Sequence, residues 1–414
     1  MITASDKRTQ RVLALFTLLL SLSAVSAEAQ NGNKPAANPR LEIYGFVQSD
    51  AGMQFNSNDP AWFDVVRPTK LPSFDNEFGE GGHTFFSVRQ TRFGAKAYFP
   101  TPIGELFTQF EWELFGTGVD AGQTTLRLRH AYGEIGRFGA GQYWSPFMDI
   151  DVFPNSLEYW GPNGMAFFRN IQFRYMPMRG SSRITLALER PGASADQGEF
   201  EDRIGLNDVR GRFPLPDFSA EGRYGGDWGY VELAGIVRAM KWDDLLEDTE
   251  DLSGDAVGWG LSLSSNWKAT DKATFRFQVV GGEGVQNYMN DAPADVGVVQ
   301  NTDGSIEGEP LGMLGLVGFL DYQWSRLFST SVGYSRLDID NSNGQEATAF
   351  KSEQYALINL LYYPATNIMV GGEFQWGQRN NAFNDFSSDD FRLQFTARFN
   401  YSLKFWSEVA TNDK

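Results

Sequence analysis

The stretch Phe391-Arg-Leu-Gln-Phe-Thr-Ala-Arg-Phe-Asn-Tyr401 decides the fold class of this chain. Apolar side chains occupy its odd positions and polar side chains its even positions. This is the period of a β-strand whose two faces meet different surroundings. The same alternation runs through residues 106–114 and 274–279, and helical periodicity is nowhere sustained after the first thirty residues. The sequence therefore predicts an all-β protein.

Sixteen such segments can be placed along the chain, and most reach the roughly 9–11 residues that a tilted membrane strand needs. They lie at residues 41–55, 83–99, 104–116, 124–136, 138–144, 167–177, 181–190, 216–225, 229–240, 256–268, 273–281, 312–325, 327–338, 352–363, 367–379 and 389–405. Long and short connections alternate strictly between them. A transmembrane antiparallel up-and-down β-barrel of about 16 strands produces this pattern, with its tight turns on the periplasmic side. A soluble β-sandwich is the alternative, but its Greek-key links do not sort in this way.

The residues on the two faces of the strands indicate which side of the barrel wall contacts water. Bulky apolar and aromatic residues share one face, and Arg, Glu, Gln, Asn and Ser share the other. A barrel of sixteen strands leaves an aqueous lumen, so the polar face is expected to point inward and the aromatic face toward lipid. Tyr322, Trp324, Tyr362 and Trp376, near strand ends, fit an interfacial girdle.

The first thirty residues have the pattern of an export signal. Lys7, Arg8 and Arg11 precede an apolar run at 12–25, which is too short to span a bilayer, and small residues follow up to Ala29. We expect a cleaved signal peptide at 1–29 and one barrel domain at 30–414. The expected location is the outer membrane of a Gram-negative cell.

Charge is unevenly distributed. The chain has 35 Lys+Arg and 52 Asp+Glu, a net charge of −17, which argues against a nucleic-acid partner. Removing residues 1–29, with three cations and two acids, gives −17 − 1 = −18. Parity places ten cations and eight acids on the lumenal face, a net 10 − 8 = +2. Nearly all the acidity is therefore expected in the loops.

Four lumenal arginines are the main candidates for solute contact. Arg127 and Arg129 are two residues apart, so they share one strand face, with Arg92 and Arg174 on nearby strands. Guanidinium groups offer two-point hydrogen bonds to carboxylates. An equally open alternative is an arginine ladder paired with Glu111 and Glu113. Arg89 has the opposite parity to Arg92, which requires either a bulge or a subunit interface.

The third long loop, at 145–166, is unusually rich in aromatic residues and proline. It follows Trp144 and includes Tyr159, so we expect a compact, packed loop. Folded into the lumen, it would narrow the pore, and its acids Asp149, Asp151 and Glu158 could face the arginine wall. The alternative is that the loop packs as an external lid or as a piece of an interface.

Catalysis finds little support. Cysteine is absent and the only histidines are His83 and His130, which excludes zinc sites built on cysteine or on three histidines. His130 falls on the outward face by parity. We expect no enzyme activity, cofactor or metal.

Several motifs carry a family resemblance. Leu126-Arg-Leu-Arg-His-Ala-Tyr-Gly-Glu134, Gly141-Gln-Tyr-Trp-Ser-Pro-Phe-Met-Asp149, Gly161-Pro-Asn-Gly164 and Arg89-Gln-Thr-Arg92-Phe-Gly resemble the DcaP-like outer-membrane porins. The resemblance implies a trimeric barrel that takes up small anions, dicarboxylates in particular. It also implies arginines that line a constriction formed by the third loop.

We therefore expect passive uptake of small anionic solutes through a homotrimer surrounded by lipid and lipopolysaccharide. The candidate pore-lining residues are Arg92, Arg127, Arg129, Arg174, Asp149, Asp151, Trp144 and Tyr159. The same-class alternative is a nonspecific or cation-preferring porin. The different-class alternative is an adhesin or structural barrel whose acidic loops are the working surface.

Overall fold

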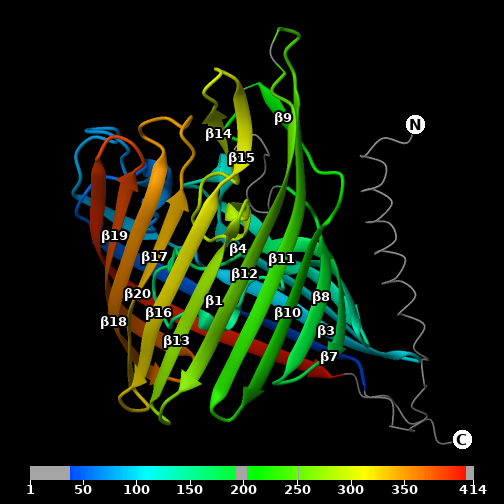
Figure 1. Ribbon diagram of the computed structural model, residues 1–414. Helices are drawn as coiled ribbons and strands as arrows, with labels where there is room; N and C mark the ends of the chain where they lie inside the picture. Colours follow the sequence, from blue (N-terminus) through cyan, green and yellow to red (C-terminus); the bar gives the residue numbers. More distant parts are fainter. Residues whose placement is uncertain (1–37, 193–202, 207, 250, 407–414) are drawn as a thin grey trace, which may run out of the picture. The chain divides into compact units, whose positions relative to one another are not determined.

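The computed structural model describes residues 38–192, 203–206, 208–249 and 251–406, so the predicted signal peptide lies outside the described residues. The chain forms one antiparallel sheet of eighteen strands and a separate two-stranded sheet (Figure 1). The large sheet comprises β1 (Arg40–Gln54), β2 (His83–Ser87), β3 (Arg92–Thr101), β4 (Gly104–Phe115), β5 (Thr124–Ile135), β6 (Phe138–Trp144), β7 (Arg169–Met178), β8 (Arg183–Glu189), β9 (Val209–Arg212), β10 (Asp217–Gly226), β11 (Gly229–Asp244), β12 (Gly254–Lys268), β13 (Ala273–Glu283), β16 (Gly312–Gln323), β17 (Phe328–Asp340), β18 (Phe350–Ala365), β19 (Ile368–Asn381) and β20 (Ser387–Trp406).

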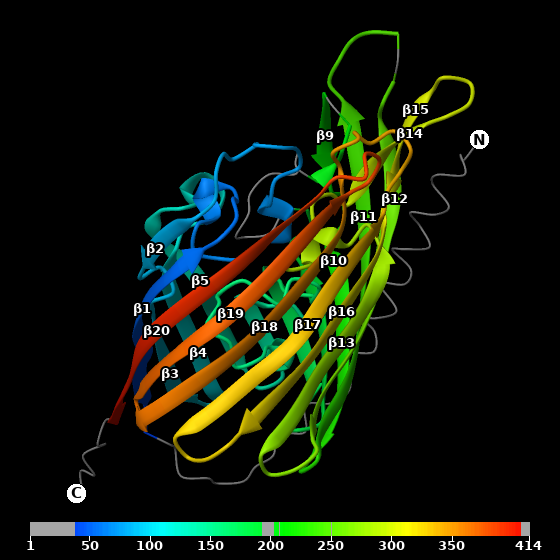
Figure 2. The same cartoon turned by 90° about the vertical axis from the view of Figure 1, so that its left-hand side faces the viewer.

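These eighteen strands make a barrel of sixteen. β2 and β3 pair with successive parts of β1, and β9 and β10 pair with successive parts of β11, so each pair is one interrupted barrel strand. The sheet closes because β1 also pairs with β20, from Arg40 opposite Trp406 to Gln54 opposite Arg392 (Figure 2). The prediction of a sixteen-stranded antiparallel barrel is confirmed.

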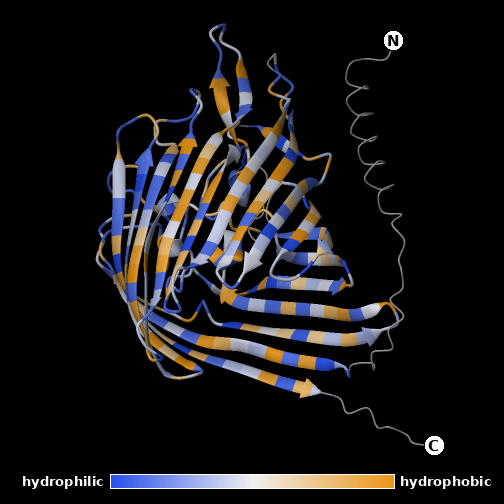
Figure 3. Cartoon of the chain, turned by 60° about the horizontal axis from the view of Figure 1, so that its bottom comes forward, coloured by the Kyte–Doolittle hydropathy of each residue, from blue (hydrophilic) through white to orange (hydrophobic). Residues whose placement is uncertain are grey.

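Polar and apolar residues alternate along the strands, as the banding of Figure 3 shows. On β20, Phe395 and Leu403 face outward and are each 57% exposed, whereas Arg392 and Gln394 face inward and are fully buried. Polar residues therefore line the barrel and apolar residues cover it. No helix among the described residues is long and apolar enough to cross a membrane.

The third long loop crosses the lumen. It runs from Ser145 to Phe168 and contains the short 3-10 helix η4 (Ile150–Val152). Phe147 and Met148 pack in a buried cluster with residues of β11 and β13, and Leu157 packs against β18 and β19. The loop begins and ends between β6 and β7; β18 and β19 lie across the barrel from these strands, whereas β11 and β13 are nearer along the sheet. The external-lid alternative is wrong because the aromatic loop finds its apolar partners inside the barrel.

Two other loops also enter the lumen, which the sequence did not predict. Val66 of the first loop joins a buried cluster with Val152 of the third. Arg67 forms a buried ion pair with Asp291 of the loop between β13 and β16, and the guanidinium nitrogen lies 2.7 Å from the carboxylate oxygen. That loop also carries the hairpin β14 (Val296–Gln300) and β15 (Ile306–Pro310), which rises beyond the rim in Figure 1.

Local irregularities redirect two side chains. The register between β4 and β5 shifts by one residue. His130 of β5 lies opposite Glu111, whereas Leu128 lies opposite Trp112, so Arg129 between them is an extra residue in β5. This β-bulge inverts the parity beyond it. His130 is consequently buried inside the barrel, and its predicted outward orientation is wrong. Arg89 lies in the break between β2 and β3, turns inward and pairs with Asp64 of the first loop; the bulge alternative is therefore favoured over a subunit interface.

Candidate functional site

A cavity of about 290 Å³ lies between the third loop and the barrel wall. Its lining includes a set of guanidinium groups and one phenol, contributed by Arg92, Arg127, Arg129, Arg169, Arg398 and Tyr159. The arginines come from β3, β5, β7 and β20, and the tyrosine from the third loop. We call this space the arginine cavity.

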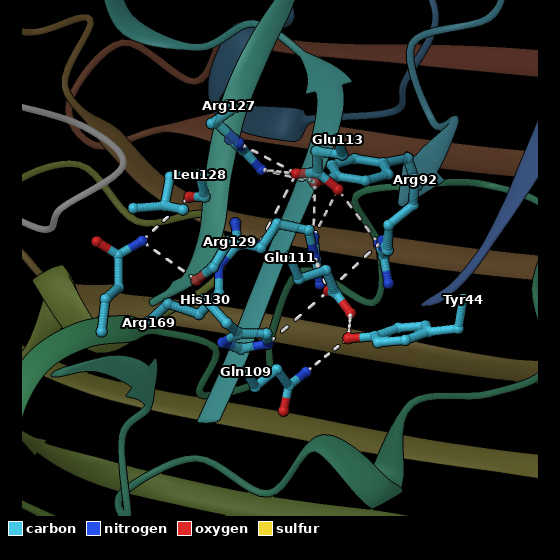
Figure 4. Close-up of polar contacts among 12 residues, drawn as sticks. Tyr44, Arg92, Gln109, Glu111, Glu113, Arg127, Leu128, Arg129, His130 and Arg169 are labelled. Carbon is cyan, nitrogen blue, oxygen red and sulfur yellow. Dashed lines mark hydrogen bonds and ion pairs between the residues drawn. The ribbon is translucent and has the colours of Figure 1, made fainter. Parts of the chain in front are cut away.

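A single carboxylate gathers four of these arginines. Glu113 projects inward from β4 with no exposed surface. Its closest nitrogens belong to Arg127 at 2.5 Å, Arg129 at 2.6 Å, Arg92 at 3.2 Å and Arg169 at 3.9 Å (Figure 4).

Glu111 extends the cluster one step along the same strand face. Its carboxylate lies 2.7 Å from Arg129 and 3.8 Å from Arg92, and it accepts a hydrogen bond of 2.8 Å from Tyr44. Four guanidinium groups are thus matched by two carboxylates, leaving a net charge of 4 − 2 = +2. The predicted ladder of arginines with Glu111 and Glu113 is present. It leaves an excess of positive charge toward the cavity.

Tyr159 attaches the third loop to this cluster. Its hydroxyl donates to Glu113 and accepts from Arg127 at 2.6 Å and from Arg129 at 3.2 Å. Its ring stacks on Phe115, with the centroids 4.0 Å apart. The phenol therefore joins the loop to the wall at the rim of the cavity.

Asp149 and Asp151 pair with a different part of the wall, at β10. Arg223 of β10 donates to both at 2.6 Å and also to Glu232 of β11 at 2.6 Å. Arg223 could not be singled out from the sequence, because the partner of a loop residue depends on the path of the loop.

Arg183 completes this second group by contacting Glu221 and Glu232, each at 2.9 Å. We call the group the counter-cluster. It contains four acids and two arginines, Asp149, Asp151, Glu221, Glu232, Arg183 and Arg223, for a net charge of 2 − 4 = −2.

Arg174 and Trp144 lie outside the cavity lining. Arg174 donates to the backbone carbonyl of Trp144 and to Gln172, and its guanidinium lies 5.0 Å from the Tyr143 ring centroid. The Trp144 ring packs edge-on against His130, with the centroids 4.4 Å apart. The structure therefore brings Arg92, Arg127, Arg129 and Tyr159 together and places Arg174 and Trp144 apart from them.

Arg398, Arg169 and Glu158 line the cavity but were not among the candidate solute contacts. Arg398 donates to Gln48 at 2.6 Å and lies 4.7 Å from the Phe46 ring centroid; among the described residues it forms no ion pair. Its lumenal parity could have identified it. Glu158 accepts hydrogen bonds from the backbone N–H groups of Val66 and Gly161. Burial nevertheless raises its pKa to about 7, an effect only partly opposed by these bonds and by Arg392.

No group of three or more His, Asp or Glu side chains within the described part of the chain has an arrangement that could hold a metal ion. The ionisable groups that line the cavity are guanidinium, phenol and carboxylate.

Comparisons with known proteins agree with this architecture. The crystal structure of the outer membrane channel DcaP of Acinetobacter baumannii has 21% sequence identity and a TM-score of 0.73, covering 89% of this chain and 99% of that chain. The anion-selective porin from Comamonas acidovorans has 8% identity and a TM-score of 0.55, covering 88% and 100%. The trimer form of OmpT, an outer membrane protein of Vibrio cholerae, has 11% identity and a TM-score of 0.53, covering 88% and 100%. These structures share the fold.

No curated protein matches the sequence. A family model described as DcaP outer membrane protein matches residues 16–401, which is most of the chain. The chain therefore belongs to the DcaP outer membrane protein family.

Proposed function

We propose that this protein is an outer-membrane channel through which small anionic solutes, dicarboxylates in particular, diffuse passively. The observation that carries the proposal is the excess of guanidinium groups at the arginine cavity. The cavity lining includes Arg92, Arg127, Arg129 and Arg169 but neither Glu111 nor Glu113, so the carboxylates lie behind the arginines. A solute in the cavity meets hydrogen-bond donors with a net positive charge, which favours a carboxylate over a cation.

The size and shape of the cavity support a solute with two carboxylates. Its volume of about 290 Å³ is near the lower end of the roughly 300–1,000 Å³ that is usual for small-molecule sites. Arg127 and Arg129 border it beside Tyr159, and Arg398 borders it beside Phe46. The Phe46 ring centroid also lies 5.4 Å from the Arg92 guanidinium, so the donors around the cavity form a continuous series from which a solute with two carboxylates can engage more than one. Because each contact replaces hydration without enclosing the solute, binding can be weak enough for release.

We extend the proposal to the surroundings of the barrel. The exposed apolar face would contact lipid and lipopolysaccharide, and the channel would be a homotrimer, exported with a signal peptide at 1–29. Support comes from the apolar outer surface and from the similar fold of OmpT, whose structure was solved in a trimer form.

A cation-preferring porin is the second candidate, and the counter-cluster favours it. The counter-cluster carries a net charge of −2 on the neighbouring part of the wall, at β8, β10 and β11, and the side chain of Asp151 in it is 48% exposed. The same lumen therefore offers one surface to each sign of charge.

Swelling of proteoliposomes tests the two candidates against each other. Wild-type protein should admit a four-carbon dicarboxylate faster than a neutral sugar of similar size. Equal rates would indicate a nonspecific channel. Faster entry of a diammonium solute than of the dicarboxylate would support the cation-preferring alternative.

A further inference from the structure

Glu113 occupies an unusual position for a carboxylate in an anion channel. It lies at the centre of the guanidinium groups that would receive the solute, yet it has no exposed surface itself. Each of its two carboxylate oxygens accepts hydrogen bonds from a different pair of side chains. Oε1 accepts from Arg127, and Oε2 accepts from Arg92 and Arg129 (Figure 4). Oε1 also accepts from the Tyr159 hydroxyl.

Four guanidinium groups in one part of a barrel repel one another, and free arginine side chains would separate toward water. A shared carboxylate opposes this repulsion and fixes the direction of each N–H group through charge-assisted hydrogen bonds. The Tyr159 contact adds a second effect, because it ties the third loop to the same carboxylate. The spacing of the donors and the position of the loop thus depend on one buried group.

We infer that Glu113 is a positioning residue for solute binding: it sets the spacing of the arginines and fastens Tyr159 beside them. The inference rests on the proposed function, since it concerns the same cavity. The inference predicts that neutralising Glu113 weakens anion binding, whereas an account based on charge alone predicts stronger binding. Neutralising Glu113 raises the net charge of the cluster from +2 to +3, which should strengthen anion binding if charge alone matters.

Glu111 provides a matched control. It lies two residues away on the same face of β4, and its neutralisation changes the charge of the cluster by the same amount. Its contacts are to Arg129, Arg92 and Tyr44, so Glu111→Gln leaves the contacts of Glu113 with Arg127 and Tyr159 in place.

The experiment measures current block by succinate, used as the probe, in single channels of the wild type, Glu113→Gln, Glu113→Asp and Glu111→Gln. For Glu113→Gln we expect about tenfold weaker block, equivalent to ~1.4 kcal/mol, with unchanged or greater preference for chloride over potassium. Glu111→Gln leaves Arg129 and Arg92 paired with Glu113, so it should lose clearly less block than Glu113→Gln. Equal or stronger block in both Gln variants would overturn the inference.

Glu113→Asp keeps the charge but withdraws the carboxylate by one methylene, so it also serves if Glu113→Gln does not fold. Weaker block with a wild-type reversal potential supports positioning, and wild-type block overturns it. Failure of the proposed function has a different signature. In that case succinate does not block the wild-type channel at all.

Discussion

Replacing Arg127 and Arg129 together with glutamine should shift the channel toward cation selectivity. Both side chains border the arginine cavity and both contact Glu113. The cluster would fall from four guanidinium groups and two carboxylates to two of each, so its net charge drops from +2 to 0. Arg92 and Arg169 remain to compensate Glu113, which keeps the buried carboxylate paired.

The size of the shift follows from Coulomb's law. One charge acts on an ion about 8 Å away through water with ~0.5 kcal/mol, and two charges with ~1 kcal/mol. A Debye length of ~10 Å at 0.1 M salt reduces this by about half. Anions and cations shift in opposite directions, so the ratio of their permeabilities changes by ~1 kcal/mol, or about fivefold.

Reversal potentials under a potassium chloride gradient measure this ratio. Arg174→Gln is the control, since it also removes a lumenal arginine but one outside the cavity lining. Its effect should be clearly smaller. At 1 M salt, where the Debye length is ~3 Å, the effect of the double variant should nearly vanish. A double variant with wild-type selectivity at low salt would refute the reasoning, because these arginines would then have only a structural role in the barrel wall.

Three further predictions follow from the loops. Replacing residues 150–160 with a short glycine-serine link should raise single-channel conductance, because this segment packs across the lumen; a folded variant with unchanged conductance would contradict that placement. Glu158 has a pKa of about 7, so it is neutral below that pH and anionic above it. Anion preference should therefore be about twofold greater at pH 6 than at pH 8, and Glu158→Gln should reduce the difference. The chain has no native cysteine, so single cysteines can report topology. A cysteine at Gly304 should be labelled in intact cells and one at Ser181 should not; the reverse result would invert the orientation.

The strands were predictable because the surroundings of each face stay the same along the whole strand. In the stretch 391–401, every inward position meets water or polar groups and every outward position meets lipid, so the alternation is uninterrupted. The pairing of Arg127 and Arg129 with Glu111 and Glu113 was foreseen as one of two alternatives for the same reason. On neighbouring strands, side chains that point to the same face lie side by side on one wall of the barrel.

What could not be predicted depends on local irregularity or on the paths of loops. One extra residue at Arg129 turned His130 inward, and sequence alternation alone does not locate such a bulge. The partner of Asp149 is Arg223, a contact set by how the third loop packs against β10 to β12. Arg169 starts its strand beside the loop, so its approach to Glu113 also required the folded chain.

The reversal potential of the wild-type channel at low salt tests the central claim most directly. The excess positive charge of the arginine cavity predicts that chloride is more permeant than potassium in a gradient near 0.1 M, where the Debye length is ~10 Å. A potential that indicates cation preference under these conditions would contradict the account. The counter-cluster and the acidic loops would then outweigh the arginines.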